Sequence, residues 1–463
     1  MKEEEGRQNN FAEGSMGKNI IRMAVPMMLA SLVNVLYSIV DRMYIGHIPG
    51  EGSLALTGLG LTMPVISIIT AFSALCGTGG APLCSIARGR GDTEGAEKIM
   101  GNAFTLLIGL GAVLTVLPLL FLKPLLFLFG ASEATAPYAQ QYAGIYICGT
   151  EFVMIALGMN YYINAQGFAK IGMLTVTLGA VINIVLDPIL IFACNMGIAG
   201  AALATVFSQF CSALWALLFL TGKKALLRLK AKNLRLERGT VKQILALGVT
   251  GFVMNVTNGL MQIAYNAQLQ RYGGDLYVGA MTVVNSVREF FFMVSHGITN
   301  GSQPVLGYNY GARMYSRVRQ GIRFTAVAGV IYAVMAWALI MLFPAPLIRI
   351  FNSDPELLAV GVPSMRTFFC AFAFMALMAT GQSVFVGLGM PKRAVFFSTL
   401  RKVVLVIPLV YLLPGLTGLG ARGVFWAEPV SDVIGGVACF TTMYLTVYRP
   451  MGKLADGAEE QRK

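Results

Sequence analysis

Charge is scarce in this chain of 463 residues: Asp, Glu, Lys and Arg together make up 12%, whereas hydrophobic residues make up 56%. A soluble domain carries roughly 25% charged and roughly 45–50% apolar residues. Apolar runs of about 20 residues recur along the chain, which is the length needed to cross a hydrocarbon core of about 30 Å. No water pairs the backbone there, so each run must be helical. The composition excludes a soluble core and predicts an all-α integral membrane protein.

Cysteine and histidine are also scarce, and their spacing excludes several kinds of site. The seven cysteines show no Cys-x-x-Cys pair, so we expect neither a disulfide nor a zinc framework, and no cofactor. The two histidines, His47 and His296, are far apart, and no outer connection exceeds about 20 residues. A membrane-embedded enzyme needs a catalytic cluster at the interface or in a large outer loop. The sequence therefore disfavours an enzyme.

Twelve membrane spans are predicted from the apolar runs. Their bounds are 18–45, 54–84, 95–121, 136–162, 171–193, 198–221, 240–270, 276–307, 318–343, 356–387, 394–413 and 422–447. An even count puts both termini on one side. Most Lys and Arg fall on the connections of that side, including the stretches Lys223–Arg238 and Lys392–Lys402. Because basic loops stay inside, we expect a multi-pass protein of the cell (inner or cytoplasmic) membrane with both termini cytoplasmic. The net charge of +13 then reflects topology and not nucleic-acid binding.

A weak internal repeat divides the chain into two halves at an offset of about 220–224 residues, as in Gly77 and Gly297, or Gly197 and Gly420. The fold expected is twelve transmembrane helices in two pseudo-symmetric six-helix bundles around a central cleft, an architecture that rocks to expose the cleft alternately to each side. The predicted parts are a cytoplasmic N-terminal tail (1–17), an N-lobe (18–221), a basic cytoplasmic linker (222–239), a C-lobe (240–447) and a cytoplasmic C-terminal tail (448–463).

Carboxylates within the spans of the first half need a reason, because an ionised group at bilayer depth costs about 2.5–3.5 kcal/mol. Asp41 shares one face of the first span with Asn34 and Tyr37. Asn183 and Asp187 share a face of the fifth span, and Pro188 follows at once. Proline cannot donate a backbone hydrogen bond, so it opens the helix at this point.

A carboxylate, an amide and an opened helix make a hard-oxygen site suited to a proton or Na⁺. Thr205, on the sixth span, could add a hydroxyl. Two carboxylates held away from water can gain and lose a proton as a pair, which coupling to a gradient requires. A headgroup contact for Asp41 and a purely structural role for Asp187 are the alternatives.

Polar residues in other spans are candidates for lining the central cleft. The seventh span carries an amide stripe, which suits neutral hydrogen bonding to a substrate or between helices. Glu151, Arg366 and Asp432 are further intramembrane charges, for which cavity lining and interhelical structure remain open. The predicted cleft residues are Asn34, Tyr37, Asn160, Asn164, Asn255, Asn258, Gln262, Asn266, Arg288, Glu289 and Glu428.

Over its whole length the chain resembles the multidrug and toxic compound extrusion (MATE) transporters, near their bacterial MepA-type branch. The resemblance is carried by four segments. They are Val40-Asp41-Arg42-Met43-Tyr44-Ile45-Gly46, Asn183-Ile-Val-Leu-Asp187-Pro188, Gly197-Ile-Ala-Gly200-Ala-Ala-Leu-Ala-Thr205 and Pro304-Val-Leu-Gly-Tyr308-Asn309. The Asn-x-x-x-Asp-Pro pattern and the Gly/Ala/Thr pattern after it are specific in combination.

The resemblance implies a secondary active antiporter that exports cationic, amphipathic compounds in exchange for H⁺ or Na⁺ and works as a monomer. It implies a cation-coupling site at Asp41, Asn183, Asp187 and Thr205, with Na⁺ as the possible metal. Some relatives use acidic residues in the seventh and tenth helices, which this chain lacks. A lipid-linked oligosaccharide flippase of the same superfamily is the alternative, although only Arg288 and Arg366 are candidates to hold a pyrophosphate.

Overall fold

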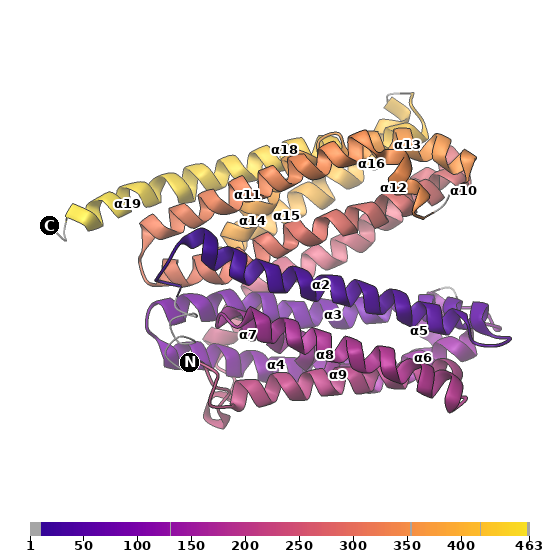
Figure 1. Ribbon diagram of the computed structural model, residues 1–463, viewed down its shortest axis with the longest axis horizontal. Helices are drawn as coiled ribbons and strands as arrows, with labels where there is room; N and C mark the ends of the chain where they lie inside the picture. The colour runs from indigo at the N-terminus through magenta and orange to yellow at the C-terminus, as the bar shows by residue number, and fades with distance from the viewer. Residues whose placement is uncertain (1–10, 130, 352–353, 417, 461–463) are drawn as a thin grey trace. The chain divides into compact units, whose positions relative to one another are not determined.

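The computed structural model describes residues 11–129, 131–351, 354–416 and 418–460, and these residues form helices and connections without a β-strand. Figure 1 shows the order of the helices along the chain. Residues 1–10 and 461–463 of the predicted terminal tails lie outside this range. The described end of the C-terminal tail is helical, as α19 (Arg449–Glu460). The prediction of an all-α fold is confirmed for the described part.

Two compact units divide the chain, and each has its own core. The first unit includes residues Leu29–Phe252, and the second includes Phe11–Met28 and Val253–Lys463. The helices of the first unit are α2 (Met16–Gly46, from Leu29 on), α3 (Gly52–Gly89), α4 (Thr93–Leu120), α5 (Leu122–Leu128), α6 (Ala136–Cys148), α7 (Thr150–Ala165), α8 (Ala169–Pro188), a π-helical turn (Ile189–Ala193), α9 (Gly197–Thr221), a 3-10 turn (Ala231–Asn233) and the start of α10 (Arg238–Gly311).

The second unit holds the remaining helices. They are the start of α2, the rest of α10, α11 (Tyr315–Leu342), α12 (Pro344–Arg349), α13 (Pro355–Phe369), α14 (Phe372–Gly387), α15 (Pro391–Thr399), a π-helical segment (Leu400–Val406), α16 (Ile407–Leu416), α17 (Ala421–Phe425), α18 (Ala427–Met443), a second π-helical segment (Tyr444–Tyr448) and α19. The predicted division into lobes at the linker 222–239 stays a prediction.

Helix length and composition agree with the predicted spans. Nine helices of the described chain are long and apolar enough to cross a membrane, or eleven if each of two bent pairs counts as one span. The bent pairs are α6 with α7, at 56°, and α13 with α14, at 45°. The predicted span 276–307 lies in α10 beyond Gly274, whose φ of 67° breaks the helical geometry there. The eleven spans together with this segment of α10 are consistent with the predicted twelve-helix architecture.

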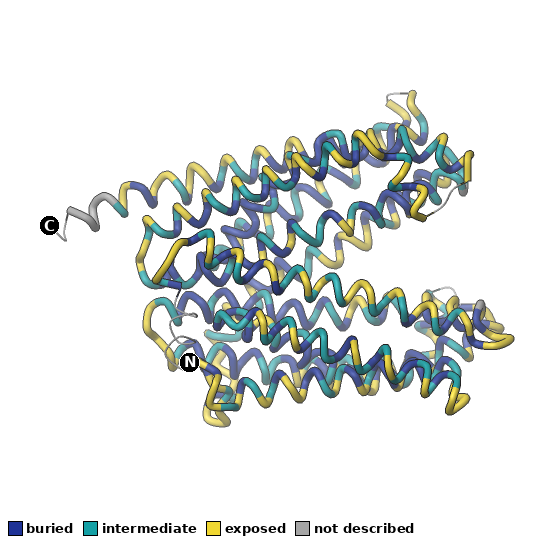
Figure 2. Tube along the Cα trace, in the orientation of Figure 1, coloured by how far each residue is buried: buried dark blue, intermediate teal, exposed yellow. Residues whose placement is uncertain are grey.

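Each core consists of apolar and small side chains, while many large apolar residues on the helices are exposed. Figure 2 shows buried and exposed positions alternating along the helices. Phe207 and Leu218 on α9 and Ile331 and Met335 on α11 are more than half exposed. Exposed apolar faces of this length are what a hydrocarbon environment requires.

Close contact between α3 and α10 in the first unit depends on two glycines. A Cβ atom on Gly248 would lie 1.8 Å from the carbonyl oxygen of Leu75, and one on Gly79 would lie 2.1 Å from the carbonyl oxygen of Ile244. Both clashing atoms belong to the backbone, so they cannot move away by a change of side-chain rotamer. Small residues at such crossings let helix backbones approach closely in membranes.

We expect Gly248→Val to lower the free energy of unfolding by about 1–3 kcal/mol, because the two backbones must separate. The matched control is Gly109→Val on α4, where nothing lies within 4 Å of the added Cβ. Unfolding of both purified variants in detergent, followed by circular dichroism, measures the difference. Equal losses in the two variants would contradict this description of the crossing.

The basic linker (222–239) is hydrogen-bonded to helices of the first unit. Glu97 of α4, which is 4% exposed, accepts the backbone N–H of Arg228 at 3.1 Å and the Nζ of Lys230 at 2.7 Å. Gln166, just after α7, accepts the N–H of Leu227 at 2.8 Å. The linker was predicted only as a polar connection, and its side-chain anchors were not predicted.

Candidate cation site and intramembrane polar residues

Asn183 and Asp187 lie on one face of α8, as their spacing of four residues predicts. The Nδ2 of Asn183 donates to Oδ1 of Asp187 at 3.1 Å and to the hydroxyl of Thr205, on α9, at 3.4 Å. One amide therefore ties the carboxylate of α8 to the hydroxyl of its neighbouring helix. Asn183 and Asp187 are fully buried, and Thr205 is 7% exposed.

Asp41 reaches this group from α2. Its side chain interacts with Asp187, and the residue is 8% exposed. We call Asp41, Asn183, Asp187 and Thr205 the carboxylate cluster. All four residues belong to the first unit, although they come from three helices that are far apart in sequence. The structure thus brings together the four residues that were predicted to form a coupling site, with both carboxylates held away from solvent.

Several oxygen atoms of the cluster are buried without a hydrogen-bond partner in the described structure: Oδ1 of Asp41, Oδ1 of Asn183 and Oδ2 of Asp187. Among the described residues no Lys or Arg forms an ion pair within 4.0 Å of either carboxylate. No group of three or more His, Cys, Asp or Glu that could hold a metal occurs there either. Two carboxylates, an amide and a hydroxyl offer hard oxygen ligands for a proton or Na⁺.

Three tyrosines surround the carboxylate cluster and were not all predicted. Tyr37, one turn before Asp41 on α2, interacts with that carboxyl group. Tyr142 of α6 lies beside Thr205 and stacks on Tyr146, with 6.1 Å between the ring centroids. Both α6 rings are buried. The spacing of four residues between Tyr142 and Tyr146 in a predicted span was the available signal, but it does not show which neighbour the rings face.

The helix of Asp187 changes geometry just after the cluster. α8 ends at Pro188, and a π-helical turn follows over Ile189–Ala193. Such turns are rare and often occur at functional sites. The predicted opening of the helix at Pro188 takes this form. The turn widens the backbone next to the buried carboxylate.

The cleft residues predicted in the first unit lie in two places. Asn34 on α2 is exposed, and Tyr37 is half-buried beside the carboxylate cluster. Asn160 and Asn164 lie on α7, where the Nδ2 of Asn160 donates to the carbonyl oxygen of Gly172 at 3.2 Å. The Oδ1 atoms of both asparagines are buried without a hydrogen-bond partner among the described residues. This pair therefore packs at the α7–α8 contact.

The amide stripe of the second unit forms a hydrogen-bonded network. The Nε2 of Gln262 donates to Oδ1 of Asn266 at 2.9 Å, and its Oε1 accepts from Nδ2 of Asn285 at 2.8 Å. A hollow of about 210 Å³ opens beside this network, lined by Gln262, Thr282, Asn285, Ser286 and the exposed Glu289. Asn255 and Asn258, on the same helix, are exposed.

A buried ionic network lies in the second unit. Arg401 and Lys402 belong both to the basic stretch Lys392–Lys402 and to the predicted span 394–413, and in the structure each is only 7% exposed within the helical segment Pro391–Leu416. Arg401 pairs with Glu428, and with Oδ1 of Asp432 at 2.7 Å. Their position inside the predicted span 394–413 was the available signal, because charges at this depth need partners.

Arg288 and Glu428 were predicted to line the cleft, while for Asp432 cavity lining and interhelical structure were both left open. Arg288 lies 4.0 Å from Oε1 of Glu428, and the hydroxyl of Tyr265 donates to Oε2 at 3.0 Å. Arg288 contacts Glu428, whereas the neighbouring Glu289 is exposed beside the hollow, so the two side chains lie on different sides, as their adjacency in sequence predicts. Arg366 is exposed and takes no part in the network. Glu428 and Asp432 are thus held in interhelical ion pairs with Arg401.

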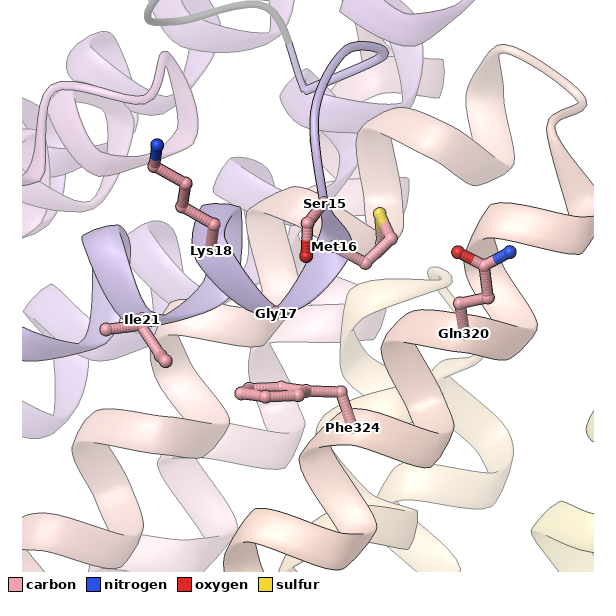
Figure 3. Close-up of a pocket in the computed structure, with 7 residues that line it drawn as sticks. All are labelled: Ser15, Met16, Gly17, Lys18, Ile21, Gln320 and Phe324. Atoms are coloured by element: carbon pink, nitrogen blue, oxygen red, sulfur yellow. The ribbon is translucent and has the colours of Figure 1, made fainter.

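A larger hollow, of about 480 Å³, lies at the start of α2 in the second unit (Figure 3). Its lining consists of Ser15, Met16, Gly17, Lys18, Ile21, Gln320 and Phe324. In Figure 3 the ring of Phe324 lies beneath Gly17, and Lys18 extends away from it. None of these residues belongs to the predicted sites. The predicted polar residues therefore do not line this hollow.

Known proteins match the chain in sequence and in fold. The model of the MatE family matches residues 26–189 and 252–412. The multidrug export protein MepA of Staphylococcus haemolyticus (strain JCSC1435) is 24% identical over 440 residues, which cover 94% of each protein. MepA of Staphylococcus aureus (strain MSSA476) is 23% identical over 441 residues, covering 94% of this chain and 95% of the relative.

Solved structures share the fold. A crystal structure of MATE in the bent conformation superposes with a TM-score of 0.91 at 23% identity, covering 97% of this chain and 99% of the other. An outward-facing multidrug resistance MATE family transporter of the MOP superfamily gives a TM-score of 0.88 at 23% identity, covering 96% and 98%. These relatives are transporters and not enzymes, as was predicted for this chain. With its membrane-spanning helices and a family match over most of its length, the chain is a multi-pass membrane protein that belongs to the MatE family.

Proposed function

We propose that this protein is a secondary active multidrug efflux antiporter that exports cationic, amphipathic compounds in exchange for H⁺ or Na⁺. The names of the MepA relatives support the export of several drugs. The carboxylate cluster supports the coupling, and it is the single observation on which the antiport mechanism depends. The export step and the coupling ion are separate parts of the proposal and are tested separately below.

Burial of two carboxylates that form no ion pair within 4.0 Å in the described residues supports a role in cation uptake. Asp41 and Asp187 interact with each other, and each has an oxygen atom that lacks a hydrogen-bond partner in the described structure. Two negative charges at this depth repel each other and lose hydration. A proton or Na⁺ between them relieves the repulsion and offsets part of the lost hydration. The cluster therefore binds a cation more favourably when it is closed from water than a single exposed carboxylate would.

Coupling follows if the cation and the drug favour opposite-facing states of the protein. Neither ligand has to touch the other, because each shifts the same equilibrium according to its own difference in affinity. In the proposed cycle, a drug binds from the cytoplasm, and cation binding at the carboxylate cluster accompanies its release outside. Alternating access between two bundles supplies the two states. We further propose that the protein functions as a monomer in the cell membrane, with both termini on the cytoplasmic side.

A lipid-linked oligosaccharide flippase remains the second candidate, because Arg401 and Lys402 add buried cations that were not counted in the sequence. Arg401 is neutralised by Glu428 and Asp432, however, so that of these two buried cations only Lys402 lacks a carboxylate partner within 4.0 Å in the described structure. One such cation supports a pyrophosphate site poorly, because a pyrophosphate carries several charges. The antiporter is the better supported function.

The test is uptake of a fluorescent organic cation into inverted membrane vesicles under an imposed pH gradient or an imposed Na⁺ gradient. We expect wild-type uptake under at least one gradient and its loss in Asp41→Asn. Glu151→Gln is the matched control, because Glu151 is a half-buried carboxylate of α7 that packs against Gly111 and lies outside the carboxylate cluster. Wild type without gradient-driven uptake would refute the proposed function. Normal uptake by Asp41→Asn under both gradients would refute the coupling site.

A further inference from the structure

Residues 230–238 of the linker, here called the docked segment, lie along the first half of α4. The carbonyl oxygen of Leu234 accepts from the hydroxyl of Thr105 at 2.7 Å, and that of Arg235 accepts from Nδ2 of Asn102 at 3.2 Å. Oδ1 of the same asparagine accepts the backbone N–H two residues after Arg235, at 2.7 Å. These hydrogen bonds within the first unit fix the backbone of the docked segment, so its side chains are held at defined positions.

The docked segment reaches along α4 to the point where the exposed apolar surface of that helix begins. Thr105 shares one face of α4 with Ile108, Ala112 and Val116, at spacings of three and four residues. Ile108 is 41% exposed and Val116 is 55% exposed. Because exposed apolar side chains of a helix that crosses a membrane face hydrocarbon, this face enters the lipid within about one turn of Thr105. The docked segment therefore lies at the boundary between hydrocarbon and headgroups.

The acidic side chains that contact the docked segment or belong to it are paired with lysines. These ion pairs are Glu97 with Lys230 at 2.7 Å, Glu94 with Lys232 at 3.7 Å, and Glu237 with Lys98 at 3.8 Å. Arg235 and Arg238 are exposed, and no carboxylate in the described part of the chain lies within 4.0 Å of either guanidinium group. Two positive charges at the boundary are therefore accessible to an anion outside the protein.

Leu236 lies between the two arginines in sequence and is 50% exposed. The backbone groups on both sides of it, the carbonyl of Arg235 and the N–H of the following residue, are bonded to Asn102. Turning Leu236 inward would break these bonds. An apolar side chain between two cations, beside the lipid-facing surface of a helix, suits the headgroup region of a bilayer, where apolar atoms meet acyl chains and cations meet phosphates.

We propose that Arg235, Leu236 and Arg238 bind an anionic phospholipid at this end of α4. The two guanidinium groups donate charge-assisted hydrogen bonds to its phosphate, and Leu236 lies against its acyl chains. Two guanidinium groups exceed the charge of one phosphate, so a headgroup that carries its own ammonium is disfavoured, and phosphatidylglycerol fits better than phosphatidylcholine. The general preference of basic loops for one side of the membrane requires no contact with a particular headgroup. The inference does not depend on the proposed function.

The test is native mass spectrometry of the purified full-length protein in detergent, titrated with phosphatidylglycerol or with phosphatidylcholine that has the same acyl chains. We expect Arg235→Gln/Arg238→Gln to weaken binding of phosphatidylglycerol roughly 10–30-fold, because each basic residue at an anionic surface adds to the affinity. Binding of phosphatidylcholine should change much less. Leu236→Ser should weaken binding of both lipids to the same extent, because they share their acyl chains.

Arg90→Gln/Arg313→Gln is the matched control, since it removes the same charge from two exposed arginines, in the α3–α4 and α10–α11 connections. It should bind both lipids as the wild type does. Phosphatidylglycerol binding that is unchanged in Arg235→Gln/Arg238→Gln, or equally weakened in the control, overturns the inference. Displacement of the lipid by inorganic phosphate overturns the choice of a lipid as the ligand. Leu236→Ser keeps both arginines, so unchanged binding of both lipids to this variant excludes the acyl-chain contact and overturns the inference independently.

Discussion

Replacing Arg401 with methionine is expected to lower the free energy of unfolding by about 3–5 kcal/mol, the largest stability effect that the structure predicts. The change leaves Glu428 and Asp432 buried, close together and without their shared cation. Arg288 compensates only part of this charge, at 4.0 Å from Glu428. Detergent-based unfolding, monitored by tryptophan fluorescence, measures the loss.

Lys402→Met is the matched control for Arg401→Met, because the two cations are adjacent and equally buried. Lys402 has neutral partners, so its removal should leave the stability unchanged or raise it. Restoring neutrality in Arg401→Met/Glu428→Gln/Asp432→Asn should recover much of the lost stability, since the uncompensated charges are then gone. If Arg401→Met and Lys402→Met unfold alike, the ionic network does not stabilise the second unit.

Replacing Asp187 with asparagine is expected to reduce gradient-driven drug uptake by about 100-fold. Asn183 keeps a hydrogen-bonding neighbour at position 187, so the local packing is preserved, but the charge that a cation would neutralise is lost. The measurement is the initial rate of uptake into inverted vesicles, under whichever gradient drives the wild type. Asp187→Glu keeps the charge and should retain part of the activity.

Drug exchange without a gradient separates coupling from drug binding. Vesicles loaded with unlabelled drug exchange it for labelled drug even when no cation moves, provided that the protein still alternates. We expect Asp187→Asn to retain this exchange while it loses gradient-driven uptake. Loss of both activities would assign Asp187 to drug binding or folding. Retention of both would remove it from the mechanism.

The helices and the polar residues on each helix face could be predicted from the sequence, because both depend on local patterns. Apolar run length gave the spans, and the spacing of four residues put Asn183 beside Asp187. The meeting of Asp41 with this pair was expected from the family resemblance. Periodicity alone does not determine it, since it reports which face is polar and not which helix lies opposite.

Arg401 and Lys402 show where sequence reasoning fails. They follow Lys392 and Arg393 closely, so they were counted with the basic stretch Lys392–Lys402 although the predicted span 394–413 includes them, and no partner was predicted for either. In the structure the helix continues through π-helical geometry from Leu400 to Val406, and both side chains are buried. Their partners Glu428 and Asp432 are on another helix. No local pattern in the chain predicts that pairing.

The linker between the halves has a consequence for engineering the protein. A long basic stretch invites insertion of a tag or a protease site, since surface connections usually tolerate added residues. Here Glu97 and Gln166 hold the backbone of Leu227 and Arg228 against the first unit. Inserted residues would detach these anchors and leave the carboxylate of Glu97 buried without its donors. The exposed turn around Glu133 is the better position for a reporter.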